Sequence, residues 1–181
     1  MIRRTLSLAL LFAAALTGCG REPPPLTEAD IAANNKGVAL MGYFDYPGAR
    51  DVFARLVERR PDWLDARTNL AIATLNRQEE GDETRALEIF AAVLEEDPEH
   101  PRARYMSGLL NLYLGNTAAS LGHLSQIAEA DPADAYAAYF IGQNLLQEGR
   151  LGETLDWFQR AAESDPYLRS AYCLLYTSDA A

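Results

Sequence analysis

The sequence predicts an all-α fold, a solenoid of antiparallel helix pairs with about four complete pairs and the start of a fifth. The main observation is an internal repeat, because prolines recur at intervals of 37, 34 and 34 residues, at Pro61, Pro98, Pro132 and Pro166. The same pattern of small and large side chains precedes each of these prolines. The apolar fraction of 49% is high enough for such an array to bury a core.

Residues 1–19 have the pattern of a bacterial export signal. Two arginines give the start a positive charge, and the apolar run that follows, 6–16, is shorter than the roughly 20 residues of a transmembrane helix. The run ends in the letters LTGC, which resemble the lipobox of bacterial lipoproteins. That resemblance implies cleavage before Cys19 and lipidation of Cys19, whereas the alternative is an ordinary secretory leader.

The resemblance to a lipoprotein signal also implies a location. Gly20 stands where lipoproteins retained in the inner membrane often carry aspartate. We therefore expect a lipid-anchored protein of the bacterial cell envelope, at the periplasmic face of the outer membrane if the host has two membranes. Residues 20–30 contain three consecutive prolines, which favour extended geometry, and are expected to form a short tether.

Residues 31–166 are expected to form four helix-pair units. In each unit a small residue stands twelve positions before the proline and a large apolar residue stands eight before it. Positions four apart lie on one face of a helix, so the small residue permits close approach and the large one fills the space beside it. The small residues are Ala49, Ala86, Ser120 and Thr154, and the large ones are Phe53, Phe90, Leu124 and Phe158.

Turn signals mark the ends of the expected helices. Aspartate precedes three of the repeat prolines, at Asp97, Asp131 and Asp165, and a residue before proline disfavours helix, so each second helix should end there. Glycine followed by Asn or Arg, at 115–116 and 149–150, indicates turns between the two helices of a unit. One close-packed position recurs in the first helices, at Gly37, Ala71, Gly108 and Gly142.

These positions resemble the tetratricopeptide repeat, a 34-residue helix–turn–helix unit. The resemblance extends over about residues 30–172 and implies a right-handed superhelix of stacked units. The second unit departs from the pattern through three extra residues in "NRQEEGDETRA", which predict a longer acidic turn.

The end of the sequence departs from the repeat. Residues 167–172 begin a fifth unit, but "CLLYTSDAA" at 173–181 does not continue its pattern. This segment resembles the in-frame translation of a transposase adapter used in sequencing libraries. We therefore expect 173–181 to be a non-native tail.

The composition argues against several classes of function. The formal net charge is −10 and Lys36 is the single lysine, so the clustered positive charge that binds nucleic acid is missing from the sequence. His100 and His123 have no metal-ligand spacing around them, and no phosphate-binding or hydrolase motif occurs. We expect a non-catalytic protein without a cofactor or a small-molecule substrate, and both histidines are expected to be solvated or at an edge.

The family resemblance implies a concave groove lined by the first helices, which binds proteins or peptides. Transferring the groove-facing positions of the family, one residue at a time, gives a candidate set in which neutral hydrogen-bonding groups alternate with tyrosines. Some of these tyrosines could instead pack between units. The candidates are Asn34, Val38, Thr68, Ile72, Asn76, Arg102, Tyr105, Leu109, Tyr113, Tyr136, Tyr139, Gln143 and Gln147.

The function expected from these observations is a protein–protein interaction scaffold, attached to the membrane only through an N-terminal lipid. One alternative is the N-terminal arm of a larger exported protein, since the repeats resemble those that precede β-propellers of the FG-GAP/UnbV type. Another is an arm of an enzyme whose active site lies outside this sequence. The clamp for a C-terminal carboxylate that some family members carry is not predicted, because only Asn69 and Arg102 match it.

Overall fold

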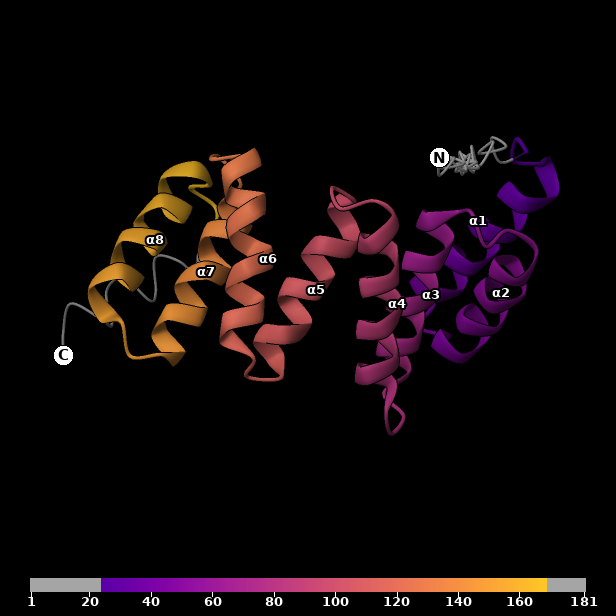
Figure 1. The fold of residues 1–181 in the computed structure, drawn as a ribbon, viewed down its shortest axis with the longest axis horizontal. Helices are drawn as coiled ribbons and strands as arrows, with labels where there is room; N and C mark the ends of the chain where they lie inside the picture. The colour runs from indigo at the N-terminus through magenta and orange to yellow at the C-terminus, as the bar shows by residue number, and fades with distance from the viewer. Residues whose placement is uncertain (1–23, 169–181) are drawn as a thin grey trace, which may run out of the picture.

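The computed structural model describes residues 24–168, and the elements that it contains are eight α-helices in four antiparallel pairs (Figure 1). This architecture confirms the predicted fold class. The helices are α1 (Glu28–Gly42), α2 (Tyr46–Arg59), α3 (Leu64–Arg77), α4 (Asp82–Glu96), α5 (Pro101–Tyr113), α6 (Thr117–Ala130), α7 (Ala135–Gln147) and α8 (Leu151–Ser164).

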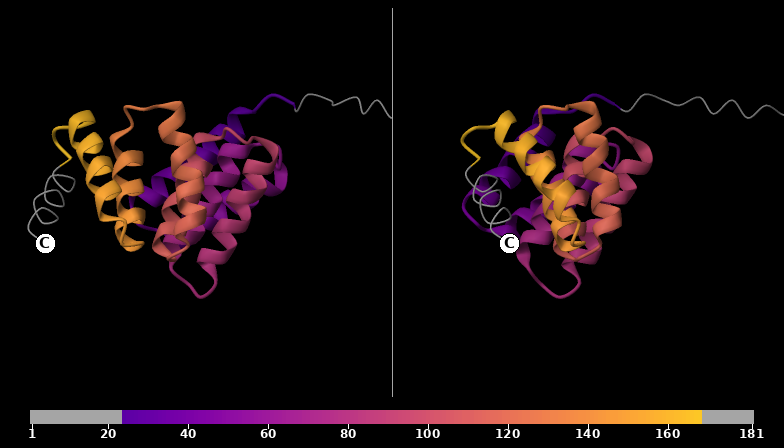
Figure 2. Two further views of the ribbon diagram at one scale, coloured as in Figure 1. Left: turned by 60° about the vertical axis from the view of Figure 1, so that its left-hand side comes forward. Right: turned by 90° about the vertical axis from the view of Figure 1, so that its left-hand side faces the viewer.

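The helix pairs follow one another in chain order along the long axis of the molecule, from α1 and α2 at one end to α7 and α8 at the other (Figures 1 and 2). Each helix packs against the next one in the sequence. The first helices of neighbouring units also contact one another, α1 with α3, α3 with α5 and α5 with α7, whereas the second helices make no comparable contacts in this part of the chain. The first helices therefore form the inner, concave layer and the second helices the outer one.

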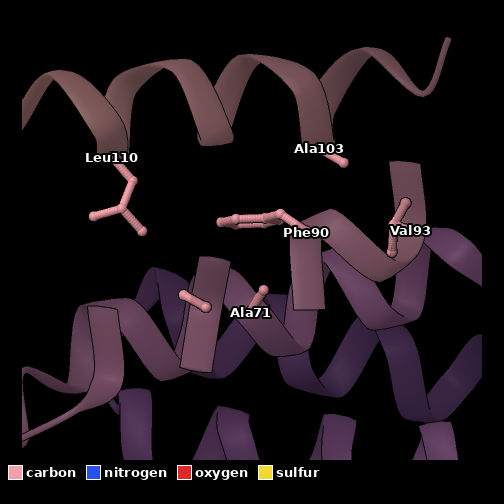
Figure 3. Packing of buried hydrophobic residues seen from close by; sticks show 6 residues of the cluster. Ala71, Phe90, Val93, Ala103 and Leu110 are labelled. Atoms are coloured by element: carbon pink, nitrogen blue, oxygen red, sulfur yellow. The ribbon is translucent and has the colours of Figure 1, made fainter. Parts of the chain in front are cut away.

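The core consists of large side chains from the second helices. Phe53, Phe90, Leu124 and Phe158 are all fully buried, as the repeat pattern predicts. In the second unit Phe90 lies between α5, which carries Ala103 and Leu110, and α3, which carries Ala71 (Figure 3). Each of the other three units has a fully buried large side chain at the equivalent position of its second helix.

The close-packed position of the first helices faces these large side chains. A Cβ atom added to Gly37 would lie 2.5 Å from the ring of Phe53, and one added to Gly142 would lie 2.5 Å from the ring of Phe158. At Gly108 the nearest atoms belong to Leu124, at 2.9 Å. In these three units the lack of a side chain lets the first helix approach its partner closely, and in the second unit the position is occupied by the small residue Ala71.

The turns between units are as predicted. Asp97, Asp131 and Asp165 are extended residues at the C-terminal ends of α4, α6 and α8. Inside the third and fourth units, Gly115 and Gly149 close the turns with φ of 76° and 73°, a conformation that favours glycine.

The first unit makes the same turn without glycine. Phe44 stands at the equivalent position with φ of 63°, and its side chain is 77% exposed. Among residues 24–168, its one aromatic contact is with the ring of Tyr46, whose centroid is 6.3 Å away. Phe44 therefore adopts a left-handed backbone conformation with little burial to compensate for it.

Replacing Phe44 by glycine is expected to raise the free energy of unfolding by about 0.5–1 kcal/mol, because glycine adopts this conformation without a steric cost. Urea unfolding followed by circular dichroism would measure the change. Phe44→Ala is the matched control, since it removes the ring but keeps the Cβ atom, and should give no comparable gain. Destabilisation by Phe44→Gly would show that the ring contributes more than the backbone conformation costs.

The three extra residues of the second unit lengthen the turn between α3 and α4, as expected, and one acidic side chain of that turn is buried. Asp82, the first residue of α4, is fully buried. Its carboxylate accepts hydrogen bonds from Arg77 at 2.7 and 3.1 Å and from the Glu79 amide at 2.9 Å. The hydrogen bonds from Arg77 hold the pKa of Asp82 below its usual value. This ion pair fixes the longer turn.

The start of α1 differs from the prediction. The tether was expected to extend to residue 30, but α1 begins at Glu28. Thr27 caps the helix, because its hydroxyl accepts a hydrogen bond from the Asp30 amide and the Asp30 carboxylate accepts one from the Thr27 amide. The "TEAD" sequence at 27–30 carries this capping signal.

The last residues of the tether are held by Arg60. Its guanidinium donates to the carbonyl oxygens of Pro24 and Pro25 at 2.7 and 3.2 Å, and to the carboxylates of Asp30 and Asp62. Arg60 is only 8% exposed. The chain that enters α1 is therefore fixed to the junction between α2 and α3.

Several predicted features lie outside the described residues. They are the leader 1–19 with Cys19, the first part of the tether, the start of the fifth unit beyond residue 168, and the tail 173–181.

Candidate functional site

The inner layer carries the side chains that the sequence assigned to a groove. Five of them are exposed: Val38, Arg102, Tyr113, Tyr136 and Gln147. Seven are half-buried: Asn34, Ile72, Asn76, Tyr105, Leu109, Tyr139 and Gln143.

The remaining candidate, Thr68, was wrongly predicted to line the groove. It is fully buried, and its hydroxyl donates a hydrogen bond to the Leu64 carbonyl at 2.9 Å within α3. The Thr68 side chain is therefore not available to a partner.

The first hollow, which we call the Tyr105 hollow, has a volume of about 500 Å³. It brings together three of the predicted residues, Ile72 from α3 and Arg102 and Tyr105 from α5. The sequence did not assign the other residues that line it, which are Pro101, Met106, Ile127 and Asp134. Most of this lining is apolar, and the two charged side chains are Arg102 and Asp134.

A second hollow of about 500 Å³, the Tyr113 hollow, lies further along the same two helices. Asn76 from α3 and Leu109 and Tyr113 from α5 are the predicted residues that it unites. Its other lining residues are Leu75, Gln78, Glu83, Met106 and Leu110. Met106 lines both hollows, so the two adjoin each other.

A third hollow, the Asp131 hollow, adjoins the first at the start of α5. It shares Pro101, Ile127 and Asp134 with the Tyr105 hollow. The sequence did not assign its other lining residues, which are Glu99, Arg104, Gln126, Ala130 and Asp131. They come from both helices of the third unit and the turns beside them, whereas the family's groove positions lie on first helices alone.

Polar groups connect the first three units on the inner layer. The Asn69 amide donates to the Asn34 side-chain oxygen at 2.9 Å, and the Asn69 oxygen accepts from Arg102 at 2.7 Å. Asn69, at the centre of this chain of hydrogen bonds, is only 3% exposed, and the chain crosses two unit boundaries. It fixes the position of Arg102 at the edge of the Tyr105 hollow.

The tyrosines divide between groove and packing. Tyr105 does both, because it lines the Tyr105 hollow while its ring meets Phe140 edge-on at 6.2 Å. Burial raises the pKa of its hydroxyl to about 12, so the group is neutral at physiological pH. Tyr139 packs on Phe158 at 5.7 Å. Tyr113, which is 79% exposed, is open to a partner.

The predicted residues of α7 line none of these three hollows. Tyr136 is 52% exposed, and the Gln143 amide donates to the Tyr139 hydroxyl at 2.8 Å. The site built by the described helices therefore centres on α3 and α5.

The prediction that His100 is solvated was also wrong. It is 6% exposed and caps α5, since its Nδ1 accepts a hydrogen bond from the Ala103 amide at 3.3 Å. Its Nε2 lies 3.6 Å from a carboxylate oxygen of Asp65. His123 is half-buried, and burial lowers the pKa of its side chain.

Within residues 24–168, no cluster of three His, Cys, Asp or Glu side chains has the geometry of a metal site. None of the helices described for this stretch has the length and apolar character needed to cross a membrane.

The family model for the tetratricopeptide repeat matches residues 34–101 and 105–168. The chain belongs to the tetratricopeptide repeat family. Each matched segment corresponds to two helix pairs, α1 to α4 for the first and α5 to α8 for the second, in agreement with the unit boundaries of the structure. No curated protein matches the chain in sequence.

Solved structures of MamA proteins share the fold of this tetratricopeptide repeat chain. "MamA 41-end from Desulfovibrio magneticus RS-1" superposes with a TM-score of 0.77 and 22% identity, over 86% of each chain. A MamA RS-1 double mutant gives the same values. A further MamA crystal structure gives a TM-score of 0.71 at 17% identity, over 86% of this chain and 85% of that one. At these identities the likeness concerns the fold.

Proposed function

We propose that this tetratricopeptide repeat protein is a non-catalytic scaffold of the bacterial cell envelope, which binds peptide segments of partner proteins along its inner layer. One observation supports the binding role above others: the adjacent Tyr105 and Tyr113 hollows together contain six of the predicted groove residues. Apolar hollows with a few fixed polar groups are typical of sites that bind a ligand.

The proposed envelope location rests on the sequence of the leader. The lipobox-like end of the apolar run would place acyl chains on Cys19, and more than one chain is needed for stable attachment to a bilayer. Arg60 holds the chain at Pro24 and Pro25, so the four residues 20–23 lie between Cys19 and the fixed body. Such a span is at most about 18 Å when extended. The scaffold would therefore stand close to the membrane.

One envelope experiment with two variants tests both parts of this proposal. The wild-type chain is expected to fractionate with membranes and to accumulate as a precursor in globomycin, whereas Cys19→Ala is expected to lose both behaviours. Leu109→Ser/Tyr113→Ser is expected to lower the recovery of cross-linked partner proteins at least fivefold, because it removes apolar lining of the Tyr113 hollow. Tyr43→Ser, at an equally exposed tyrosine outside the hollows, is the matched control.

The two parts can fail separately. Unchanged processing and fractionation of Cys19→Ala would contradict the lipid anchor and leave the groove in place. Undiminished partner recovery by the Leu109/Tyr113 variant, with its circular dichroism spectrum intact, would contradict the groove.

A further inference from the structure

The three hollows lie next to one another along α5, and together we call them the α5 trough. The Tyr113 and Tyr105 hollows share the lining residue Met106, and the Tyr105 and Asp131 hollows share Pro101, Ile127 and Asp134. We propose that the α5 trough binds an extended cationic segment in which leucine-sized apolar residues alternate with lysine or arginine. This inference rests on the proposed peptide-binding function and specifies its ligand class.

The spacing of the hollows favours alternating apolar residues. Ile72 and Tyr105 line one hollow, and the residues four positions later on the same two helices, Asn76 and Leu109, line the next. Four helical residues correspond to about 6 Å along both axes. An extended chain advances about 6.6 Å in two residues, and residues i and i+2 lie on the same side of it. Two large side chains separated by one residue would therefore enter the two hollows.

Polar groups beside the hollows suit an extended backbone. Asn76 donates one hydrogen bond from its side chain to the Ile72 carbonyl, at 2.8 Å, which leaves its side-chain oxygen available to accept one. The Tyr105 hydroxyl remains protonated at physiological pH and can donate a hydrogen bond. An extended peptide presents unpaired backbone N–H and C=O groups to such side chains, whereas a helical peptide satisfies its own.

The charges at the edges of the trough favour a cationic ligand. Glu83 lines the Tyr113 hollow, Asp134 lines the two others, and Glu99 and Asp131 line the Asp131 hollow. None of these four carboxylates has an ion-pair partner within the stretch 24–168.

Two arginines also border the trough, but both are engaged with neutral side chains. Arg102 donates to the side-chain oxygen of Asn69, and Arg104 donates to that of Gln126. The four carboxylates outnumber them, and the whole chain carries a net charge of −10. Complementary charge favours encounter with basic segments and disfavours acidic ones.

The test uses the purified full-length chain in a neutral detergent, with four fluorescein-labelled nine-residue peptides as probes. The peptides alternate Leu with Lys, Leu with Glu, Leu with Ser, and Ser with Lys. Fluorescence anisotropy is expected to show the Leu/Lys peptide binding at least tenfold more tightly than both the Leu/Glu and the Ser/Lys peptides. The Leu/Ser peptide should lie between them.

Paired variants separate the trough from the general charge of the protein. Glu83→Gln/Asp134→Asn is expected to weaken Leu/Lys binding at least fivefold and to leave Leu/Ser binding unchanged, and asparagine at 134 can still cap α7. Glu58→Gln/Glu88→Gln removes the same charge from exposed positions of α2 and α4 outside the trough, and should change Leu/Lys binding by less than twofold.

Each other outcome overturns the inference. Equal effects of the two paired variants would show attraction to the whole acidic chain rather than to the trough. Leu/Glu binding as tight as Leu/Lys, and weakened by Leu109→Ser/Tyr113→Ser, would refute the cationic ligand while the peptide-binding function stands. Absence of binding by all the leucine peptides would contradict the peptide-binding function as well.

Discussion

Replacing Phe90 by alanine is expected to lower the free energy of unfolding by about 3–5 kcal/mol, the range found when a buried phenylalanine is truncated. Phe90 is fully buried where α3, α4 and α5 meet, and it packs with Ala71, Val93 and Leu110 (Figure 3). The side chains around it come from α3, α4 and α5. Each of these helices is held by the packing of its own unit, so the cavity that Phe90→Ala leaves cannot collapse easily. Urea unfolding followed by circular dichroism measures the loss.

The repeat offers a matched control for this substitution. Leu124 fills the equivalent position of the third unit and is also fully buried. Phe90→Leu should therefore cost much less than Phe90→Ala, about 1–1.5 kcal/mol. Tyr113→Ala, on an exposed side chain of α5, should change stability by less than about 0.5 kcal/mol. A loss below about 1.5 kcal/mol for Phe90→Ala would indicate that neighbouring units adjust to fill the space.

Replacing Asp82 by asparagine is expected to lower the free energy of unfolding by about 2–4 kcal/mol at neutral pH. The substitution keeps the size of the side chain but removes the charge that pairs with Arg77 at 2.7 Å. Breaking a buried ion pair leaves the other charge without compensation, and the estimate is reduced here because the Arg77 side chain is 15% exposed. Glu83→Gln, at the next residue of α4, is the control, because Glu83 has no ion-pair partner in the described stretch and should change stability by less than about 0.5 kcal/mol.

The contribution of Asp82 should also depend on pH. Hydrogen bonds from Arg77 lower the pKa of Asp82 in the folded protein relative to the unfolded chain. A lowered pKa gives stability that is fully present above the unfolded value, about 3.9, and is lost as the pH falls through the folded value. The difference in unfolding free energy between wild type and Asp82→Asn should therefore shrink as the pH is lowered from 7 to 3. A constant difference across this range would contradict the role assigned to the carboxylate.

The sequence predicted the helix pairs because their determinants are local and are repeated four times. Phe53, Phe90, Leu124 and Phe158 recur at fixed distances from the prolines, and the structure buries all four. The longer turn of the second unit was likewise visible as three inserted residues. The burial of Asp82 beside Arg77 could not be predicted, because an exposed acidic turn and a turn with a buried ion pair would have the same residues in the sequence.

The candidate site was predicted in part. Ile72, Asn76, Arg102, Tyr105, Leu109 and Tyr113 lie in the hollows, because the family's groove positions depend on the face of a single helix. The prediction for Thr68 was wrong, since its side chain is fully buried. Ile127 and Asp134 were missed because Ile127 lies on a second helix, and Asp134, the N-cap of α7, reaches the site only through the stacking of the fourth unit on the third.

By itself, the sequence determined the all-α fold, the unit boundaries and the core, since each depends on spacing within one repeat. Only the tertiary structure decided which inner side chains remain open, that the three hollows adjoin one another along α5, and that Arg60 holds Pro24 and Pro25. The physical reason is that these features depend on contacts between segments far apart in the sequence, whose distances and angles arise from the packing of whole helices and are not encoded at any single repeat position.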